Sequence, residues 1–228
     1  MANANTATWS GRSILWRKVM GTGTEPKNIG WGTSSVTASA NPNVNLFAPA
    51  TEARTVGTSS LVSTSQLADT YQVTGTITCA VGAKTITEAG LFDTTTLSPT
   101  TTVSASMTAA QTSVLLGAAV GAGLATSSYY RQIENETVLV TGGSNSTTET
   151  IVRGALGSTS AAHASGVATT IGGDGNAASV SGTNSGEGGT SKVSTATFGG
   201  SMFAHADFAG IALNVSDSIN FTFLDQLT

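Results

Sequence analysis

Apolar and polar residues alternate along several short stretches of the chain, and a period of two predicts half-buried β-strands. The longest such stretch is 70–81, and residues 58–66 before it are its expected partner. Gly82-Ala83 is expected to turn the chain into another strand over 85–92. The face of 70–81 that we expect to be buried carries Tyr71, Val73, Ile77, Cys79 and Val81.

Two distant segments, 85–93 and 198–224, read as parts of one strand meander. A Gly199-Gly200 turn would join the strand ending at Phe92 to a strand over 201–208, and a last strand over 219–223 would follow. In that last strand Ile219, Phe221 and Phe223 share one face, and Asn220 and Thr222 share the other. The chain between the two segments is therefore predicted to be an insertion.

The predicted insertion contains short strands of its own, enough for a small β-barrel or roll. A Thr-rich linker at 94–103 precedes them, and a Gly/Ser-rich linker at 172–197 follows them. The expected strands are 114–116, 129–134, 137–141, 149–153 and 167–171.

The first part of the chain has weaker patterns. Residues 1–9 are small and polar, which predicts an arm that is disordered or docked on a partner. Ser10 is expected to cap a short helix that runs to about Met20 and ends at Gly21. Residues 36–56 are expected to form a loop that Leu46-Phe47 anchors in the core.

These elements predict an all-β fold, with an antiparallel β-sandwich or jelly-roll-like base domain, a short N-terminal helix and an inserted small β-barrel or roll. The predicted division of the 228 residues is an arm and helix at 1–20, a discontinuous base at 21–93 plus 198–228, an inserted domain at 94–171, and the linker at 172–197.

Composition narrows the function classes. Only 10% of the residues are charged and the net charge is −4, which argues against a nucleic-acid surface because phosphate neutralisation needs clustered cations. The longest apolar run, 114–124, is too short for a membrane span, and no signal peptide is visible, so we expect a soluble protein made in a cytoplasm. The one cysteine, Cys79, excludes an internal disulfide and is expected to be buried and inert.

Four ionisable residues are candidates for chemistry. Glu88 lies among apolar residues, and we expect it to pair with Arg54 or to accept backbone N–H bonds at a turn. His205 and Asp207 share a strand face, which is expected to face the surface, while His163 is expected to make local hydrogen bonds. No nucleophile or metal-ligand spacing accompanies them, so the sequence predicts no catalytic, metal or cofactor-binding site, no cofactor and no enzyme.

Several motifs of the predicted base resemble a family of small virion proteins of tailed bacteriophages. In that family the last of these motifs runs directly into a Gly-Gly-x-Met-Phe-Ala-Arg-type strand and a final strand similar to 217–223, whereas here the two are separated. The motifs are Gly21-Thr-Gly-Thr-Glu-Pro, Gly30-Trp-Gly-Thr, Glu52-Ala-Arg, Tyr71-Gln-Val-x-Gly-Thr-Ile and Ile86-Thr-Glu-Ala-Gly-Leu-Phe-Asp.

The predicted insertion has a resemblance of its own, to a small β module that recurs in phage fibre, tail and head-associated proteins. Its motifs are Tyr130-x-Gln-Ile-x-Asn-Glu-x-Val-Leu-Val, Ile151-Val-Arg-Gly, Gly157-Ser-Thr and Ala161-Ala-His-Ala-x-Gly.

Together the resemblances imply a structural protein of the virion. The first expectation is a capsid decoration (cement) protein that stiffens the head lattice. It would assemble with itself as a homo-oligomer, a trimer being one option, and bind the major capsid protein or other virion proteins. The alternative is a tail, neck or fibre component whose insertion is a distal adhesive domain that can bind a glycan. An enzyme that degrades the cell envelope ranks last, because no acid pair or triad is present.

Overall fold

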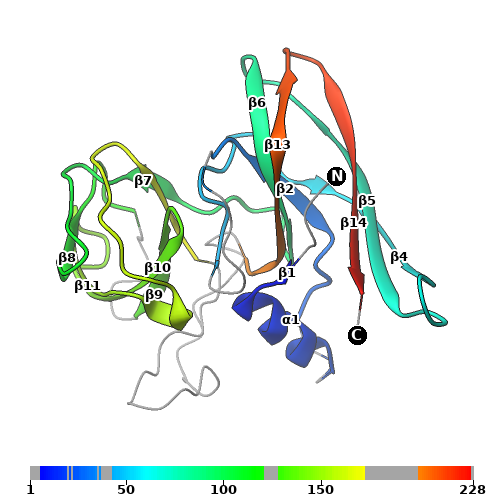
Figure 1. The fold of residues 1–228 in the computed structure, drawn as a ribbon, viewed down its shortest axis with the longest axis horizontal. Helices are drawn as coiled ribbons and strands as arrows, with labels where there is room; N and C mark the ends of the chain where they lie inside the picture. The colour runs from blue at the N-terminus through cyan, green and yellow to red at the C-terminus, as the bar shows by residue number, and fades with distance from the viewer. Residues whose placement is uncertain are drawn as a thin grey trace.

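The computed structural model describes residues 6–19, 21, 23–34, 36, 43–120, 128–172 and 200–226. This part of the chain is mostly β, and every pair of neighbouring strands is antiparallel. The strands form three sheets: a six-stranded sheet on the left of Figure 1, and a five-stranded and a three-stranded sheet on the right.

The five-stranded and three-stranded sheets share one hydrophobic core. Residues Ile29, Ile86 and Leu91 enter it from the first sheet, and Val73 and Ile77 enter it from the second. The five-stranded sheet has the order β1 (Thr6–Ala7), β13 (Met202–Leu213), β6 (Lys84–Phe92), β2 (Asn28–Gly32) and β3 (Thr55–Val56), and the three-stranded sheet has the order β14 (Ser218–Gln226), β5 (Thr70–Thr78) and β4 (Thr58–Val62).

A long antiparallel ribbon folds over to make both of these sheets. β6 pairs with β13, the ribbon bends at the top of Figure 1, and the chain continues as the pair of β5 with β14. At the bend Ser216 N–H donates to the Cys79 carbonyl (2.7 Å), and Cys79 N–H donates to the Asp217 carbonyl (2.9 Å). The expected meander is therefore wrong in its last strand, because β14 crosses to the other sheet and pairs with β5.

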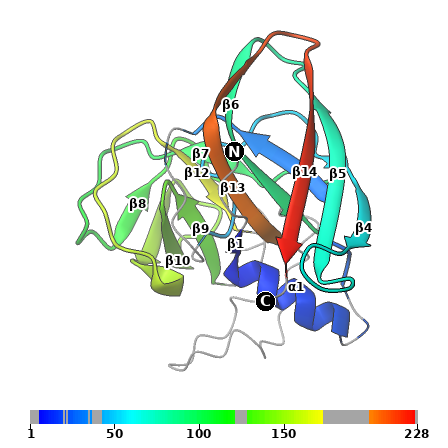
Figure 2. The same ribbon diagram turned by 45° about the vertical axis from the view of Figure 1, so that its right-hand side comes forward.

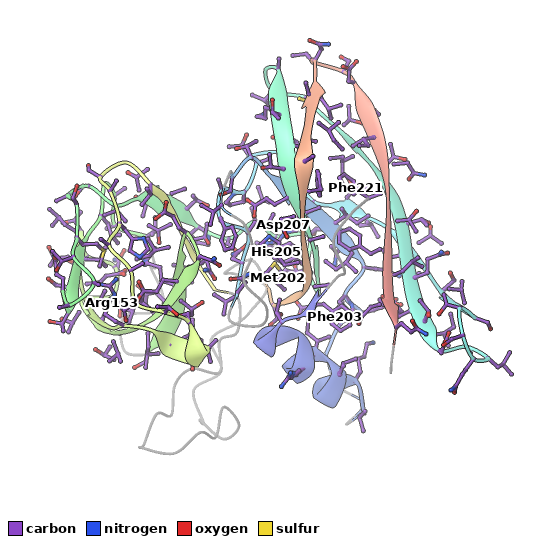
Figure 3. All side chains as sticks on the ribbon, in the orientation of Figure 1. Arg153, Met202, Phe203, His205, Asp207 and Phe221 are labelled. Atoms are coloured by element: carbon purple, nitrogen blue, oxygen red, sulfur yellow. The ribbon has the colours of Figure 1, made fainter. Side chains whose placement is uncertain are left out.

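The predicted strand faces are mostly confirmed. Val73, Ile77 and Cys79 are buried, whereas Val81 is 60% exposed because it lies beyond the end of β5, at the bend. Phe223 is buried, and Phe221 is half-buried between β13 and β14 (Figure 3).

Helix α1 (Trp9–Val19) lies across the end of the base where β13 begins (Figure 2). Its first turn is capped by Thr8, whose Oγ1 accepts the Gly11 N–H (3.0 Å), rather than by Ser10. Just before the helix, Thr6 and Ala7 pair with His205 and Ala204 of β13. The expectation of a disordered or partner-docked arm is therefore wrong at these two residues, and residues 1–5 lie outside the described part.

The six-stranded sheet surrounds a second hydrophobic cluster, which includes Val103, Tyr129, Ile133, Val138 and Ile151. Ser104 N–H donates to the Leu115 carbonyl, and Gly117 N–H donates to the Thr102 carbonyl, so the sheet curls until its two edges meet. Its order is β7 (Thr100–Thr102), β12 (Ala168–Ile171), β9 (Tyr129–Ile133), β10 (Glu136–Gly142), β11 (Thr148–Val152) and β8 (Ser113–Leu115), and one 3-10 turn (Ala155–Gly157) follows β11.

The chain leaves the base for the six-stranded sheet and returns from it at nearly the same place. Asp93 N–H donates to the Ser201 carbonyl (3.2 Å), and Ser201 N–H donates to Asp93 Oδ1 (2.7 Å). Gly200 has φ +64°, and a Cβ there would lie 2.2 Å from Asp93 Oδ1, so this position requires glycine. Gly199 and the predicted linker from 173 onward lie outside the described residues, and the predicted domain division stays a prediction.

Candidate functional site

A buried carboxylate and a buried imidazole meet where the loop 43–50 crosses the five-stranded sheet. His205 Nε2 lies 3.0 Å from Glu88 Oε2, and both side chains are almost fully buried. The N–H groups of Phe47 (3.0 Å) and Ala48 (2.8 Å) donate to the two oxygens of Glu88. The ring of Phe47 packs edge-on against the imidazole of His205.

The other ring nitrogen of His205 faces an amide. Asn43 Nδ2 lies 3.2 Å from His205 Nδ1, so an amide N–H donates to Nδ1, and Nε2 carries the ring proton toward Glu88. Gly32 makes room for this arrangement, because a Cβ at that residue would lie 2.3 Å from Glu88 Oε1. The group therefore fixes the loop 43–48 to β6 and β13.

The same loop also reaches the six-stranded sheet. Val44 N–H donates to Gln132 Oε1 (3.0 Å), and Asn45 Nδ2 donates to the Ile171 carbonyl (3.0 Å). Leu46 and Phe47 are buried, which confirms the predicted anchor. Residues 43–48 are thus a hydrogen-bonded bridge between the base and the six-stranded sheet, and Glu88 and His205 hold its base end.

Of the two partners expected for Glu88, the backbone N–H groups are confirmed and Arg54 is wrong. Arg54 lies with its guanidinium carbon 3.4 Å from the centre of the Phe92 ring, and its Nη1 donates to the Thr94 carbonyl (3.1 Å). Burial lowers the pKa of Arg54 to about 9, although the nearby Asp93 charge raises it. Arg54 also borders a cavity of about 300 Å³, which Trp31, Leu46, Leu97 and Ser98 help to line.

The expectation that His205 and Asp207 face the surface is wrong for His205. The imidazole lies under the loop 43–48, while Asp207, two residues further along β13, is only partly buried (Figure 3). The strand pattern does not indicate this cover, because the loop that supplies it lies more than 150 residues earlier in the chain. A histidine next to Glu88, which the sequence did not suggest, is therefore present.

A second ionic cluster, centred on Glu136, lies in the six-stranded sheet. Arg153 donates to it from Nε (2.7 Å) and Nη2 (2.6 Å), and the N–H groups of Gly154 and Ala161 donate at 3.0 Å. His163 Nε2 lies 2.9 Å from Glu136 Oε2, and its Nδ1 lies 2.7 Å from Glu134 Oε2. His163 is a hydrogen-bonding residue as expected, but its partners lie in the β9–β10 hairpin rather than nearby in sequence.

The partners of this cluster shift two pKa values in opposite directions. Burial alone would raise the pKa of Glu136, but the bonds from Arg153, His163 and two backbone N–H groups outweigh it and lower the pKa to about 2. Burial alone would lower the pKa of His163, but its bonds to Glu136 and Glu134 outweigh it and raise the pKa above its ordinary value.

A third ionic group crosses the interior of the same sheet. Arg131 donates to Glu149 from Nε (2.8 Å) and Nη2 (2.6 Å), and both side chains are fully buried. The Tyr129 hydroxyl donates to the same carboxylate, and burial, together with that negative charge, raises the tyrosine pKa. This bidentate pair lies in the interior of the sheet, and each buried charge is compensated by its partner.

These internal charges are not among the candidate residues predicted from the sequence, although the alternation along the strands contains the signal. Arg131 lies two residues from both Tyr129 and Ile133, and Glu149 lies two residues from Ile151, so both charges fall on faces that carry core residues. Opposite charges on the inward faces of two strands of one sheet predict a buried ion pair, which here spans β10 between β9 and β11. Glu136 and Arg153 have no comparable signal, because they lie at strand ends.

The carboxylates of the two clusters are hydrogen-bonded within their own chain. In the described part of the chain, no group of three or more His, Cys, Asp or Glu side chains is placed to hold a metal ion. Within the same residues, no helix is long and apolar enough to cross a bilayer. The Glu88 and Glu136 carboxylates already accept several hydrogen bonds each, so what they can do is hold loops in place.

Comparison of the chain with protein-family models, with curated proteins and with solved structures gives no match.

Proposed function

We propose that this protein is a structural component of a tailed-bacteriophage virion, and specifically a capsid decoration protein that binds the head lattice through its base. The observation that carries the proposal is the distribution of exposed apolar side chains. Eleven large hydrophobic residues of the described chain are exposed, and nine of them lie outside 94–172. Exposed apolar groups mark contact surfaces, so the base is the part built for contact.

Three of these residues follow one edge of the base. Val56, Leu61 and Leu67 are 59%, 68% and 92% exposed, and they lie on β3, on β4 and in the β4–β5 turn. β4 is an edge strand that pairs only with β5. The segment 55–68 contains no charged residue and no proline, although these are the devices that normally keep sheet edges from pairing with other chains.

The charges of the molecule support a structural role over an enzymatic one. Glu88, His205, Glu136, His163, Arg131 and Glu149 are each buried and hydrogen-bonded to one another or to backbone groups. Groups used in this way stabilise loops and strands, and no cofactor is needed to explain any of them. The resemblance of the base and of 130–166 to phage virion modules supports the same role.

The architecture also supports a structural role. The folded-over ribbon supports a jelly-roll-like sandwich as the base, and the adjacency of Asp93 and Ser201 supports an inserted β module that begins and ends at one point. The base would contact the major capsid protein and further copies of the chain, and the six-stranded sheet would face solvent. Thr6 and Ala7 of the N-terminal arm pair with β13 of their own chain, so these two residues are not assigned to this contact.

The copy number of the protein in purified particles tests this proposal. A decoration protein recurs with the capsid lattice, so quantitative mass spectrometry should find it in a fixed ratio to the major capsid protein. A few copies per particle would favour a tail, neck or fibre position instead. Absence from the particle would overturn the proposal.

A further inference from the structure

His163 is the one histidine of the chain whose two ring nitrogens both face carboxylates. Nδ1 lies 2.7 Å from Glu134 Oε2, and Nε2 lies 2.9 Å from Glu136 Oε2. A neutral imidazole has a single N–H, so one of these contacts would set a nitrogen lone pair against a carboxylate oxygen. Only the doubly protonated ring satisfies both contacts.

The proton that this geometry requires belongs to the histidine rather than to either acid. Glu136 accepts bonds from Arg153 and from the Gly154 and Ala161 N–H groups, and these donors hold it ionised. Glu134 has a side chain that is one-third exposed, so water also stabilises its charge. With Arg153 and His163 positive and Glu134 and Glu136 negative, the cluster is neutral as a whole.

The histidine lies in the segment 161–166, whose backbone is hydrogen-bonded to the segment 103–107. His163 exchanges backbone hydrogen bonds with Met107 (2.9 and 3.0 Å), and Gly166 N–H donates to the Val103 carbonyl (2.7 Å). Met107 and Val103 belong to the hydrophobic cluster beneath. The imidazolium thus ties the segment to Glu134 and Glu136 on one side, while its backbone ties it to 103–107 on the other.

We propose that protonated His163 is a latch that holds the segment 161–166 closed on the six-stranded sheet, and that loss of this proton releases the segment. The charged groups that face the ring are Glu134 from the β9–β10 turn and Glu136 from β10, with Arg153 from the end of β11 bonded to Glu136. The backbone of Met107 pairs with that of His163, and Arg153 and Glu136 also bond the carbonyl and the N–H of Ala161. The protein therefore carries a proton-controlled opening within this sheet, in addition to its role in the particle.

The raised pKa of His163 fixes the direction of the response. A group whose pKa is higher in the closed state contributes stability that is complete below its ordinary pKa and is lost as the pH rises through the raised value. The latch is therefore closed at the ordinary histidine pKa and opens as the pH rises through the raised value.

NMR titration of the full chain tests the latch, because the protein contains only two histidines. The ring signals, assigned with His163→Gln, should show His163 titrating above the ordinary histidine pKa. Between the ordinary histidine pKa and the measured midpoint of His163, the hydrogen-exchange rates of the Met107 and His163 amides should rise about tenfold per pH unit beyond the intrinsic increase. Leu139 in the β9–β10 hairpin, measured in the same spectra, is the reference that should not respond.

Glu134→Gln is the matched variant, since it removes one carboxylate charge at a partly exposed position and keeps the size of the side chain. It should lower the titration midpoint of His163 and lower by the same amount the pH at which the rise in exchange ends. A wild-type His163 midpoint at or below the ordinary value would overturn the proposal. So would exchange at Met107 and His163 that shows no link to the midpoint.

Discussion

The base and the six-stranded sheet use charged and apolar residues in opposite ways. The six-stranded sheet buries Arg131 with Glu149 at its centre, and it exposes only two large hydrophobic side chains, Leu115 and Val152, among the residues described. The base has a larger apolar core, yet it exposes Leu61 and Leu67 strongly along one edge. The first region places most of its charged and apolar contacts inside, whereas the second leaves apolar surface exposed.

This difference indicates that the two regions are stabilised in different ways. A sheet that curls until its edges meet has few free backbone groups, and internal ion pairs fix its strands without any external partner. The base keeps β4 and β14 as edge strands of its three-stranded sheet. We expect the six-stranded sheet to depend on its charges for stability and the base to depend on its apolar residues for both stability and contact.

The largest expected effect is the loss of one partner of the buried pair. Glu149→Gln leaves the Arg131 charge buried without a counter-charge, and the free energy of unfolding should fall by about 3–5 kcal/mol. Urea unfolding of the full chain measures the change. The double variant Arg131→Met/Glu149→Leu removes both charges and should recover part of the loss; a single variant as stable as wild type would contradict the role given to the pair.

In the base the largest loss of stability is expected from a buried aromatic residue. Phe223→Ala should lower the free energy of unfolding by about 3–5 kcal/mol, because Phe223 is buried in the shared core. Phe221→Ala should cost less, because that ring is half-buried, and Thr222→Ala on the exposed face should cost least. Thermal and urea denaturation check the order, and equal effects of Phe223→Ala and Thr222→Ala would show that the assigned faces are wrong.

The pH dependence of the six-stranded sheet should have two sides. The folded-state pKa of Glu136 lies at about 2, below its ordinary value of 4.5, so its contribution is present above the ordinary value and is lost as the pH falls toward 2. The pKa of His163 is raised, so its contribution is lost as the pH rises. Urea midpoints measured across pH should fall on both sides, and Glu136→Gln should flatten the acid side. An unchanged acid side in that variant would contradict the role of Glu136.

The smallest expected effect concerns the rate at which Cys79 reacts with thiol reagents. Cys79 is buried at the bend of the ribbon, and its Sγ lies 3.0 Å from the Gly82 carbonyl oxygen. It should react with thiol reagents far more slowly in the native protein than in urea. Reaction at the same rate in both conditions would show that the bend opens readily.

The sequence predicted the strands better than it predicted their partners. Alternation located β5, β6 and β14, because each has one face in the core. It could not show that the ribbon bends between 78 and 84, because the choice of sheet depends on contacts between distant segments. β7 was assigned to a linker, since three successive threonines carry no apolar alternation.

Prediction of the candidate site was more limited for the same reason. Glu88 stood out as a charge within an apolar strand, and its backbone partners were anticipated as one option. His205 could not be linked to it, since the two residues meet only because β13 pairs with β6 and the loop 43–48 covers both. When an irregular loop covers a polar residue of a strand, the sequence shows no periodic pattern that would reveal the burial.

The central claim is that the base, and not the six-stranded sheet, makes the contact with the particle. Leu61→Asp and Val152→Asp place the same charge on exposed residues of the two regions, 68% and 52% exposed in the structure, so both variants should fold. Each is mixed with capsids that lack the protein and sedimented with them. The account predicts that Leu61→Asp loses binding while Val152→Asp binds as wild type; full binding of Leu61→Asp with loss in Val152→Asp would contradict it.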